Sequence, residues 1–357
     1  MSRHTIKAIV LTAILVLATA AGADAKLFRF EDSFEYEVKS GFELNVTNTS
    51  GDISVTRQAG DKVIVKVIKE VDASNRDDAE EKEDRVEVEI KADENKIDID
   101  TRYPRGQGSD GFWGKLIGLD KGYNGSVSYE IEVPVGLDLY VATTSGDVTL
   151  TGLEGEAQVS ATSSNITIRE HNGDCDIDNT SGNIVLRDVT GHININSTSS
   201  DALFDNISGD VDLQATSGDT EANWVTGSVR ISKTSGYVRI TKSSGNIEIN
   251  SISGDIEIDQ KEGGFSLSTA SGDISVTSEF ANGTRFEAET TSGNISVRVP
   301  NEVKGDVRLQ TVSGNIDTDL ALEVKSFNRN RLEGRLRGGG TGIYLTSTSG
   351  DISLEEY

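Results

Sequence analysis

The chain has 357 residues, and its 59 acidic residues outnumber the 34 basic ones to give a formal net charge of −25. A body this acidic repels a phosphate backbone, so nucleic acid is excluded as a partner. The single cysteine, Cys175, excludes an intramolecular disulfide and a cysteine-based zinc cluster. Stability therefore has to come from packing and hydrogen bonding.

The first 25 residues have the pattern of a cleavable secretory signal peptide. Basic residues at positions 3 and 7 precede an apolar run from 8 to 21, and an A-x-A cleavage motif ends at Ala25. The run is too short for a stable membrane span, and no later stretch is apolar for long enough to cross a bilayer. We therefore expect export to the periplasm or the cell surface, with no transmembrane segment in the mature chain.

Residues 26–140 predict a β-rich N-terminal cap with the first strands. Several short stretches alternate between apolar and polar residues, as half-buried strands do. They cover residues 42–46, 63–67, 86–90 and 97–99. The highly charged stretch from Asp77 to Arg85 forms either a helical turn or a solvated loop. Residues 103–125 are rich in glycine and predict a long mobile loop, in which Trp113 either packs back on the body or offers an exposed contact.

A nine-residue frame then repeats fifteen times without a gap, with its turn positions at every ninth residue from 146 to 272. Thirteen of these positions are glycine, and Ser164 and Ser200 are the exceptions. The residues two and four places later are apolar apart from Thr220, and their neighbours are nearly all polar. This alternation predicts short strands separated by turns. The fixed short period is typical of a solenoid.

Alternate frames resemble each other more than neighbouring frames do, so the true repeat is eighteen residues. In every second frame serine precedes the turn position, and Asp or Asn almost always follows it. A three-sided coil would distribute these serines over several edges, whereas a two-sided coil stacks them along one corner. The predicted structural turn ladder consists of Ser145, Ser163, Ser181, Ser199, Ser217, Ser235, Ser253 and Ser271 with Gly146, Gly182, Gly218, Gly236, Gly254 and Gly272.

These patterns predict an all-β fold in which residues 141–357 form a parallel β-solenoid of two-strand coils. Strands of neighbouring coils lie about 4.8 Å apart, and the residues two and four places after each turn face inward. Glycine allows φ > 0 at the corners, while Ser and Asx cap local backbone N–H groups. Weaker copies of the motif at 292–294, 313–315 and 349–351 predict irregular C-terminal coils.

Two runs of the sequence carry a family resemblance. Residues 126–136 and 139–148, reading SVSYEIEVPVG and LYVATTSGDV, and the closing run 342–352 resemble bacterial exported β-strand-repeat proteins labelled "putative adhesin", which carry the domain of unknown function numbered 4097. The resemblance covers most of the chain from Phe42 onward. It implies a β-solenoid in an extracytoplasmic location, and it brings no established catalytic residues.

Residues suited to catalysis are few. Beyond residue 25 the only histidines are His171 and His192, and the serines form a ladder where a triad needs one placed nucleophile. A polysaccharide-active β-helix enzyme would instead use outward carboxylates, which otherwise form a charged outer face. Those carboxylates are Asp176, Asp212, Glu221, Glu248 and Glu257. Tyr237 and Trp224 are the few outward aromatic residues that a sugar could contact.

Calcium is the main chemical alternative. Calcium-binding β-rolls share the two nine-residue halves, the glycine and the Asx, but this chain lacks their G-G-x-G before the aspartate. Calcium takes six to eight oxygens, so one Asx per corner would need help from the backbone and neighbouring coils. The candidate ligands are Asp147, Asp201, Asp219, Asp255 and Asp273.

Two further features have structural interpretations. Cys175 falls in an inward column and predicts a small buried apolar residue. The basic cluster Arg329, Arg331, Arg335 and Arg337 either pairs with the acidic surface of the chain or docks an acidic partner or lipid headgroups. Together the observations predict an exported, non-enzymatic envelope module without a cofactor, in contact with an envelope protein or a polysaccharide.

Overall fold

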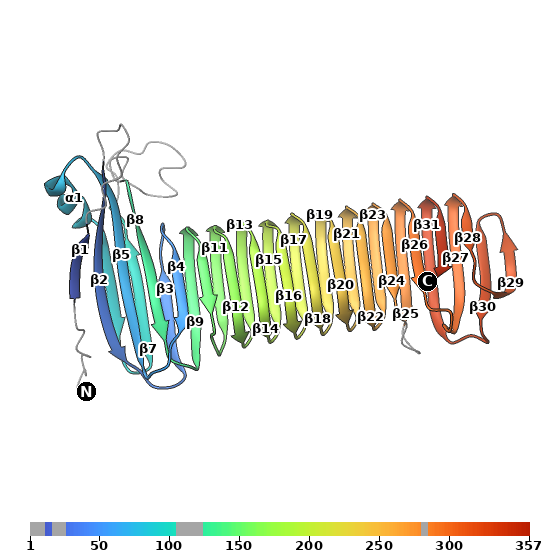
Figure 1. Cartoon of the computed structure of the whole chain (residues 1–357). Coiled ribbons are helices and arrows are strands. Elements are labelled where there is room, and N and C mark those ends of the chain that lie inside the picture. The colour runs from blue at the N-terminus through green and yellow to red at the C-terminus, as the bar shows by residue number, and fades with distance from the viewer. Residues whose placement is uncertain (1–10, 16–25, 105–123, 280–284) are drawn as a thin grey trace. The chain divides into compact units, whose positions relative to one another are not determined.

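The computed structural model describes residues 11–15, 26–104, 124–279 and 285–357. The chain divides into two compact units, residues 1–174 and residues 175–357. Nearly all of the described secondary structure is β-strand (Figure 1). No helix in the described part of the chain has the length and apolar character needed to cross a membrane.

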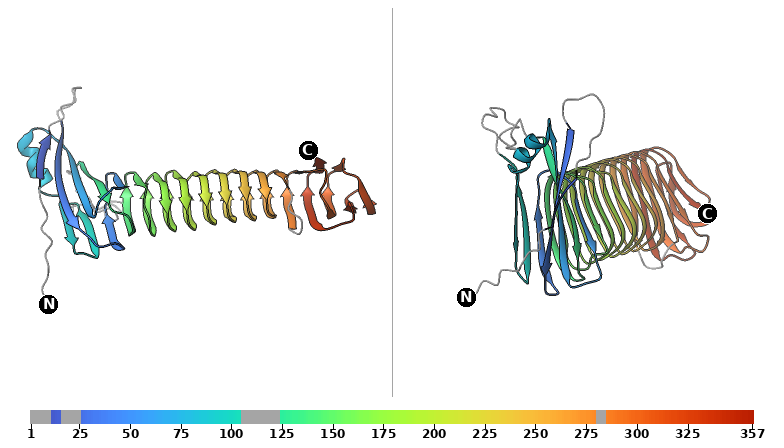
Figure 2. Two further views of the ribbon diagram at one scale, coloured as in Figure 1. Left: turned by 60° about the horizontal axis from the view of Figure 1, so that its bottom comes forward. Right: turned by 60° about the vertical axis from the view of Figure 1, so that its left-hand side comes forward.

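The second unit contains regular coils of two strands each. Their strands are stacked as two sheets, which we call sheet A and sheet B (Figures 1 and 2). In sheet B they are β13 (Cys175–Ser181), β15 (Ile193–Ser199), β17 (Val211–Ser217), β19 (Val229–Ser235), β21 (Ile247–Ser253), β23 (Phe265–Ser271) and β25 (Arg285–Ser292). In sheet A they are β14 (Ile184–Thr190), β16 (Ala202–Ser208), β18 (Thr220–Thr226), β20 (Val238–Ser244), β22 (Ile256–Glu262), β24 (Ile274–Ser278) and β26 (Ile295–Val299).

The pairing of these strands confirms the predicted repeat. All neighbours in the regular coils are parallel. Partners up to β23 and β24 are eighteen residues apart, as in the pair Ile193–Val211 and the pair Ile184–Ala202, apart from a register shift between β20 and β22. The step to β25 and β26 spans twenty-one residues, as in the pair Phe265–Phe286 and the pair Ile274–Ile295. A coil therefore has two sides. The residues two and four places after each turn are buried, including Thr220, the one polar member of these columns. Cys175 is also buried, as predicted.

The C-terminal coils are stacked in a different order from their order in the chain. The strands are β27 (Gly305–Ser313), β28 (Ile316–Thr318), β29 (Leu322–Asn328), β30 (Arg331–Leu336), β31 (Thr341–Ser349) and β32 (Ile352–Glu356). In sheet B β31 lies between β25 and β27, and in sheet A β32 lies between β26 and β28. The coil of β31 and β32 is thus inserted between two coils that precede it in the chain. Strand β30 then pairs antiparallel with β27, and β29 pairs antiparallel with β30.

The first unit combines solenoid coils with an antiparallel cap. Its strands are β2 (Lys26–Glu37), β3 (Phe42–Thr47), β4 (Ile53–Arg57), β5 (Lys62–Ala73), β6 (Glu87–Ala92), β7 (Lys96–Arg102), β8 (Gly125–Val133), β9 (Leu137–Ser145), β10 (Val148–Thr151), β11 (Ala157–Ser163) and β12 (Ile166–Asn172). The coil of β3 and β4 stacks on the coil of β9 and β10. Strands β2, β5 and β8 pair antiparallel in sheet A, and β6 pairs antiparallel with β7 in sheet B. The coil of β3 and β4 lies within residues 26–140, where the cap and first strands were predicted, and the two compact units divide after Asp174.

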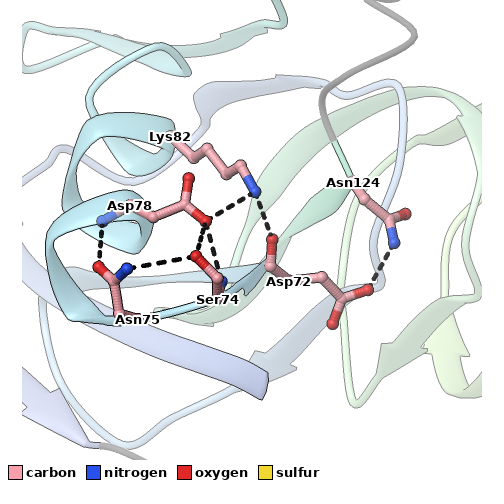
Figure 3. A network of polar contacts seen from close by, with 6 residues as sticks. All are labelled: Asp72, Ser74, Asn75, Asp78, Lys82 and Asn124. Carbon is pink, nitrogen blue, oxygen red and sulfur yellow. Dashed lines mark hydrogen bonds and ion pairs between the residues drawn. The ribbon is translucent and has the colours of Figure 1, made fainter. Parts of the chain in front are cut away.

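The charged stretch at 77–85 forms the helix α1 (Arg76–Glu83), which is the helical one of its two expected forms. Asn75 caps the helix by accepting a hydrogen bond from the backbone N–H of Asp78 (Figure 3). Lys82 joins the helix to β5 by donating to the carbonyl oxygen of Asp72 at 2.9 Å. Ala79 is buried against a small apolar cluster of β2 and β5 that includes Phe28.

Two predictions concern segments of which little is described. Within the predicted signal peptide, β1 (Leu11–Leu15) pairs antiparallel with β2, and the rest of the peptide lies outside the described residues. Most of the predicted loop at 103–125, with Trp113, also lies outside them. At its start, Tyr103 Oη donates to the carbonyl oxygen of Ser50.

Candidate functional site

The glycines of the predicted ladder stack in direct contact. A Cβ added at Gly236 would lie 2.1 Å from the carbonyl oxygen of Gly218, and one added at Gly254 would lie 2.2 Å from that of Gly236. These glycines also have positive φ, 107° at Gly236 and 131° at Gly254. Two constraints therefore select glycine: the left-handed backbone and the close approach of the next coil.

The aspartates of the same corner form a second ladder. The carboxylate of Asp201 accepts a hydrogen bond from the backbone N–H of Asp219 at 2.8 Å. Asp219 accepts in the same way from Tyr237, and Asp255 from Asp273, both at 2.8 Å. In the first unit Asp147 accepts from Asn165 at 3.3 Å. Asp and Asn alternate freely at this position because either side chain supplies the required acceptor oxygen.

The serines of the ladder lie in register, and their hydroxyls bond mainly to the backbone of the preceding coil. Ser217 Oγ lies 3.1 Å from Ser199 Oγ and donates to the carbonyl oxygen of Thr198 at 3.2 Å. At the exceptional position, Ser200 is buried, and the amide of Asn179 donates to its hydroxyl at 3.4 Å. The ladder thus links coils through hydrogen bonds.

The five aspartates predicted as candidate calcium ligands belong to the aspartate ladder. All five lie at stacked corners, and each accepts a backbone N–H from the following coil. Among the described residues, no three His, Cys, Asp or Glu side chains are grouped so as to hold a metal ion. The aspartates therefore have an evident structural role, and the prediction of calcium binding is a question for experiment.

The sixth residue after the turn distinguishes the two sheets, a feature that the sequence analysis missed. In sheet A from β12 to β20 this residue has positive φ and the seventh residue is buried, whereas in β22 and β24 the sixth residue, Gln260 or Ser278, is itself buried. The left-handed residues are Glu170, Asp188, Asn206, Trp224 and Lys242, and the buried ones are His171, Val189, Ile207, Val225 and Ser243. In sheet B the sixth residue faces inward instead. Those residues are Ala161, Asn179, Ser197, Ala215, Lys233, Ser251 and Thr269.

Lys233 places an ammonium group inside the corner. Its Nζ donates to the carbonyl oxygens of Gly218 and Tyr237, at 2.6 and 3.2 Å, and to Thr220 Oγ1 at 3.3 Å. Burial lowers the pKa of Lys233, and the nearby Asp219 and Asp201 act in the opposite direction. The lysine thereby satisfies carbonyl groups that the stacked glycines leave inside the solenoid.

The two histidines lie in different environments. His171 is a buried seventh residue of β12, and burial is the main cause that lowers its pKa. His192 lies on the outer face of the second unit, where Nε2 is 3.4 Å from a carboxylate oxygen of Asp212.

The outward carboxylates are partly neutralised along the sheet faces. Arg230 links Asp212 and Glu248, at 2.6 and 3.4 Å. Arg239 pairs with Glu257 at 2.8 Å, and Tyr237 also hydrogen bonds to that carboxylate. The remaining two accept from asparagines: Asp176 from Asn194 and Glu221 from Asn223. These contacts are those of a charged outer face with cross-strand pairs.

The basic cluster near the C-terminus pairs largely with the chain itself. Arg331 lies 2.5 Å from Glu333, and Arg335 lies 3.1 Å from Asp306. Arg337 donates to the backbone carbonyl of Asn301 at 2.9 Å. These contacts follow the first of the two interpretations of the cluster, in which the arginines bind the protein's own surface.

Trp224 is the centre of a cationic aromatic cluster on the outer face of sheet A. Its side chain is 48% exposed. The ammonium groups of Lys242 and Lys261 lie 4.4 and 5.2 Å from the centre of its ring system. Lys242 occupies the equivalent position one coil later, so the eighteen-residue spacing could have revealed this pair in the sequence.

Comparison with known proteins identifies one family. The model of the family described as Toastrack DUF4097 matches residues 123–243 and 208–355, which together make up more than half of the chain. No curated protein matches the chain.

Two solved structures are similar to the chain at low identity. A "putative cell adhesion protein" from Clostridium sporogenes ATCC 15579 is 8% identical, with 92% of this chain and 99% of that chain covered and a TM-score of 0.25. A "Putative lipid binding protein" from Parabacteroides distasonis ATCC 8503 is 13% identical, with 92% and 96% covered and a TM-score of 0.33. At these scores neither structure carries an argument about function.

Proposed function

Because this chain belongs to the Toastrack DUF4097 family, we propose that it is an exported, non-enzymatic β-solenoid that acts as a structural and interaction module of the cell envelope. The observation that carries this proposal is the regular exposure of outward side chains at eighteen-residue intervals along both sheets of the second unit. Such a surface offers many equivalent weak contacts. It therefore suits an extended envelope protein or a polysaccharide with its own repeat.

The positions of the reactive side chains support a non-enzymatic role. The ladder serines are bonded to neighbouring coils, His171 is buried, and the outward carboxylates form cross-strand pairs. A pocket of about 500 Å³ on the outer face of sheet B includes Glu248, Phe265 and Arg285. Turnover of an envelope polysaccharide by the purified protein, abolished by Glu248→Gln, would overturn this part of the proposal.

Export and envelope contact are tested in cells and with isolated envelopes. A C-terminally tagged chain is expected in the envelope or extracellular fraction with Lys26 as its first residue. The purified protein is expected to sediment with isolated envelopes of its source bacterium. Recovery in the cytosol with residues 1–25 retained would contradict export, and failure to sediment would contradict the interaction role.

The stacked carboxylates at the corner keep calcium binding as the second candidate function. If calcium is structural, excess EDTA will lower the melting temperature, and added calcium will restore it. An unchanged melting temperature and an unchanged β-sheet circular dichroism spectrum in EDTA would rule out structural calcium. In that case the aspartate ladder is explained by its hydrogen bonds alone.

A further inference from the structure

We infer that Trp224, Lys242 and Lys261 form a binding site for an acidic polysaccharide, such as one rich in uronate groups. This inference rests on the proposed function and names the ligand class for one place on the surface. It starts from an aromatic side chain that the fold does not require at its position.

The backbone at Trp224 disfavours tryptophan. Its φ is 57°, in the left-handed region that bulky side chains rarely adopt. The equivalent residues in the two preceding coils are Asp188 and Asn206, which tolerate this conformation through their short polar side chains. Nearly half of the tryptophan side chain is exposed, so packing does not explain it. A residue that opposes its local backbone points to a role at the surface.

The two lysines beside the ring carry charges available for a ligand. No ion pair to Lys242 or Lys261 is found among the described residues, although the chain has 59 acidic residues. Other cations of the same faces do have carboxylate partners, such as Arg239 with Glu257. The lysines lie 4.4 and 5.2 Å from the ring centre, so the charges and the aromatic face adjoin.

This combination matches the chemistry of an acidic sugar. The apolar face of a sugar ring can lie against an indole, and its carboxylate can pair with an ammonium group. Asn223 and Thr241, on the adjacent outer positions, add polar groups. A single-stranded nucleic acid fits less well, because it uses successive stacked aromatic residues and this cluster has one aromatic ring, that of Trp224.

The test measures binding of the purified full chain to polygalacturonate by titration calorimetry, with dextran as the neutral polymer. We expect Trp224→Asn to weaken binding at least tenfold. Asparagine already occupies this position at Asn206, so the variant keeps the backbone conformation, and an unchanged or higher melting temperature verifies its fold. The combined change Lys242→Asn with Lys261→Gln is expected to cause a similar loss. Trp224→Tyr is expected to retain part of the affinity.

A matched control removes the same number of positive charges elsewhere. The double variant Arg169→Gln with Lys304→Gln changes two exposed cations that are not among those over the ring, and we expect binding within twofold of the unmodified protein. Equal binding by Trp224→Asn, an equal loss in the control, or equal affinity for dextran would overturn the inference.

Two outcomes separate this inference from the proposed function. If the unmodified protein sediments with envelopes but does not bind polygalacturonate, only the site assignment is wrong. If single-stranded DNA or phosphatidylglycerol vesicles bind in a Trp224-dependent manner and polygalacturonate does not, the ligand class is wrong. If the protein binds polygalacturonate through Trp224 but does not sediment with envelopes, the site stands and the envelope role fails.

Discussion

The two strands of one coil begin alike and end differently. Strands β17 and β18 both bury the residues two and four places after their turns. In β17 the sixth residue, Ala215, then faces inward and Thr216 is exposed. In β18 the sixth residue, Trp224, faces outward with φ 57°, and Val225 is buried. One left-handed residue therefore shifts the alternation by one place and decides which side chain enters the core.

This difference gives each side of the coil its own interior and its own surface. From β12 to β20, each strand of sheet A gains a third, mostly apolar residue in the core, and its sixth side chain becomes a surface group. Sheet B keeps small or polar residues inside, such as Thr269, and these can bond to the carbonyl groups of the following corner. The same nine-residue frame thus serves two chemical roles.

The largest loss of stability is expected at the stacked glycines, which precede the strands of both sheets. Gly254→Val would place Cβ about 2.2 Å from the carbonyl oxygen of Gly236 at a left-handed backbone. We expect it to destabilise the protein by about 3 kcal/mol or more. Ser244→Ala should cost less than about 1 kcal/mol. Equal losses in urea unfolding, followed by circular dichroism, would show that the corners tolerate a side chain.

The next effect separates the seventh residues of the two strand types. Val225 is fully buried, so Val225→Ala removes core contacts and should cost about 2 kcal/mol. The exposed Thr216→Ala should change stability by no more than about 0.5 kcal/mol. Urea unfolding of both variants measures the difference. Similar losses of stability in the two variants would mean that the Val225 side chain is not buried in the core in solution.

A smaller, pH-dependent effect is expected at the sixth residue of sheet B. Burial lowers the pKa of Lys233 in the folded state below its ordinary value of 10.5. Between these two pKa values the unfolded chain binds more protons, so stability should rise with pH up to about 10.5 and level off above it. Lys233→Thr should remove this rise. The exposed Lys304→Gln should retain it, and an unchanged rise in Lys233→Thr would show that another group is responsible.

A related effect at acid pH concerns the seventh residue of β12. Burial lowers the pKa of His171 below its ordinary value of 6.5, so the unfolded chain takes up a proton first as the pH falls. Stability should therefore be present above pH 6.5 and decline from there towards the folded pKa. His171→Val copies Val189 of the next repeat and should remove this decline, whereas His192→Asn should leave it. Denaturation measured between pH 7 and 5 decides this.

Much of the fold was predictable because the sequence repeat follows the burial of side chains and the geometry of the coil. Alternation at the second and fourth places reports burial, and serine at every eighteenth residue reports a two-sided coil. The sixth-place difference was less visible: Asp188 and Asn206 tolerate a left-handed backbone, but Glu170 and Trp224 do not signal it. The cationic cluster required knowing that Trp224 and Lys242, at the sixth place, and Lys261, at the seventh place of β22, are all exposed.

In the C-terminal coils the order of the strands in the stack differs from their order in the chain. The motifs at Gly293, Gly314 and Gly350 occur in that order in the chain. In the stack Gly350 lies between the other two. A Cβ added at Gly350 would meet the carbonyl oxygen of Gly293, and a Cβ added at Gly314 would meet the carbonyl oxygen of Gly350. Any parallel coil can stack on any other of the same register, so the motif itself does not specify its neighbour.

The sequence by itself determined the strands, the two-sided coil and the stacked corners, because these depend on side-chain periodicity and on the backbone limits of glycine. The tertiary structure decided the order of the last coils and the direction of the sixth side chains. Those features depend on which coils stack and which carbonyl groups they bring together. At Trp224 the residue's own backbone preference even opposes the left-handed conformation that it adopts. It is at such a position that the surface carries its most distinctive group.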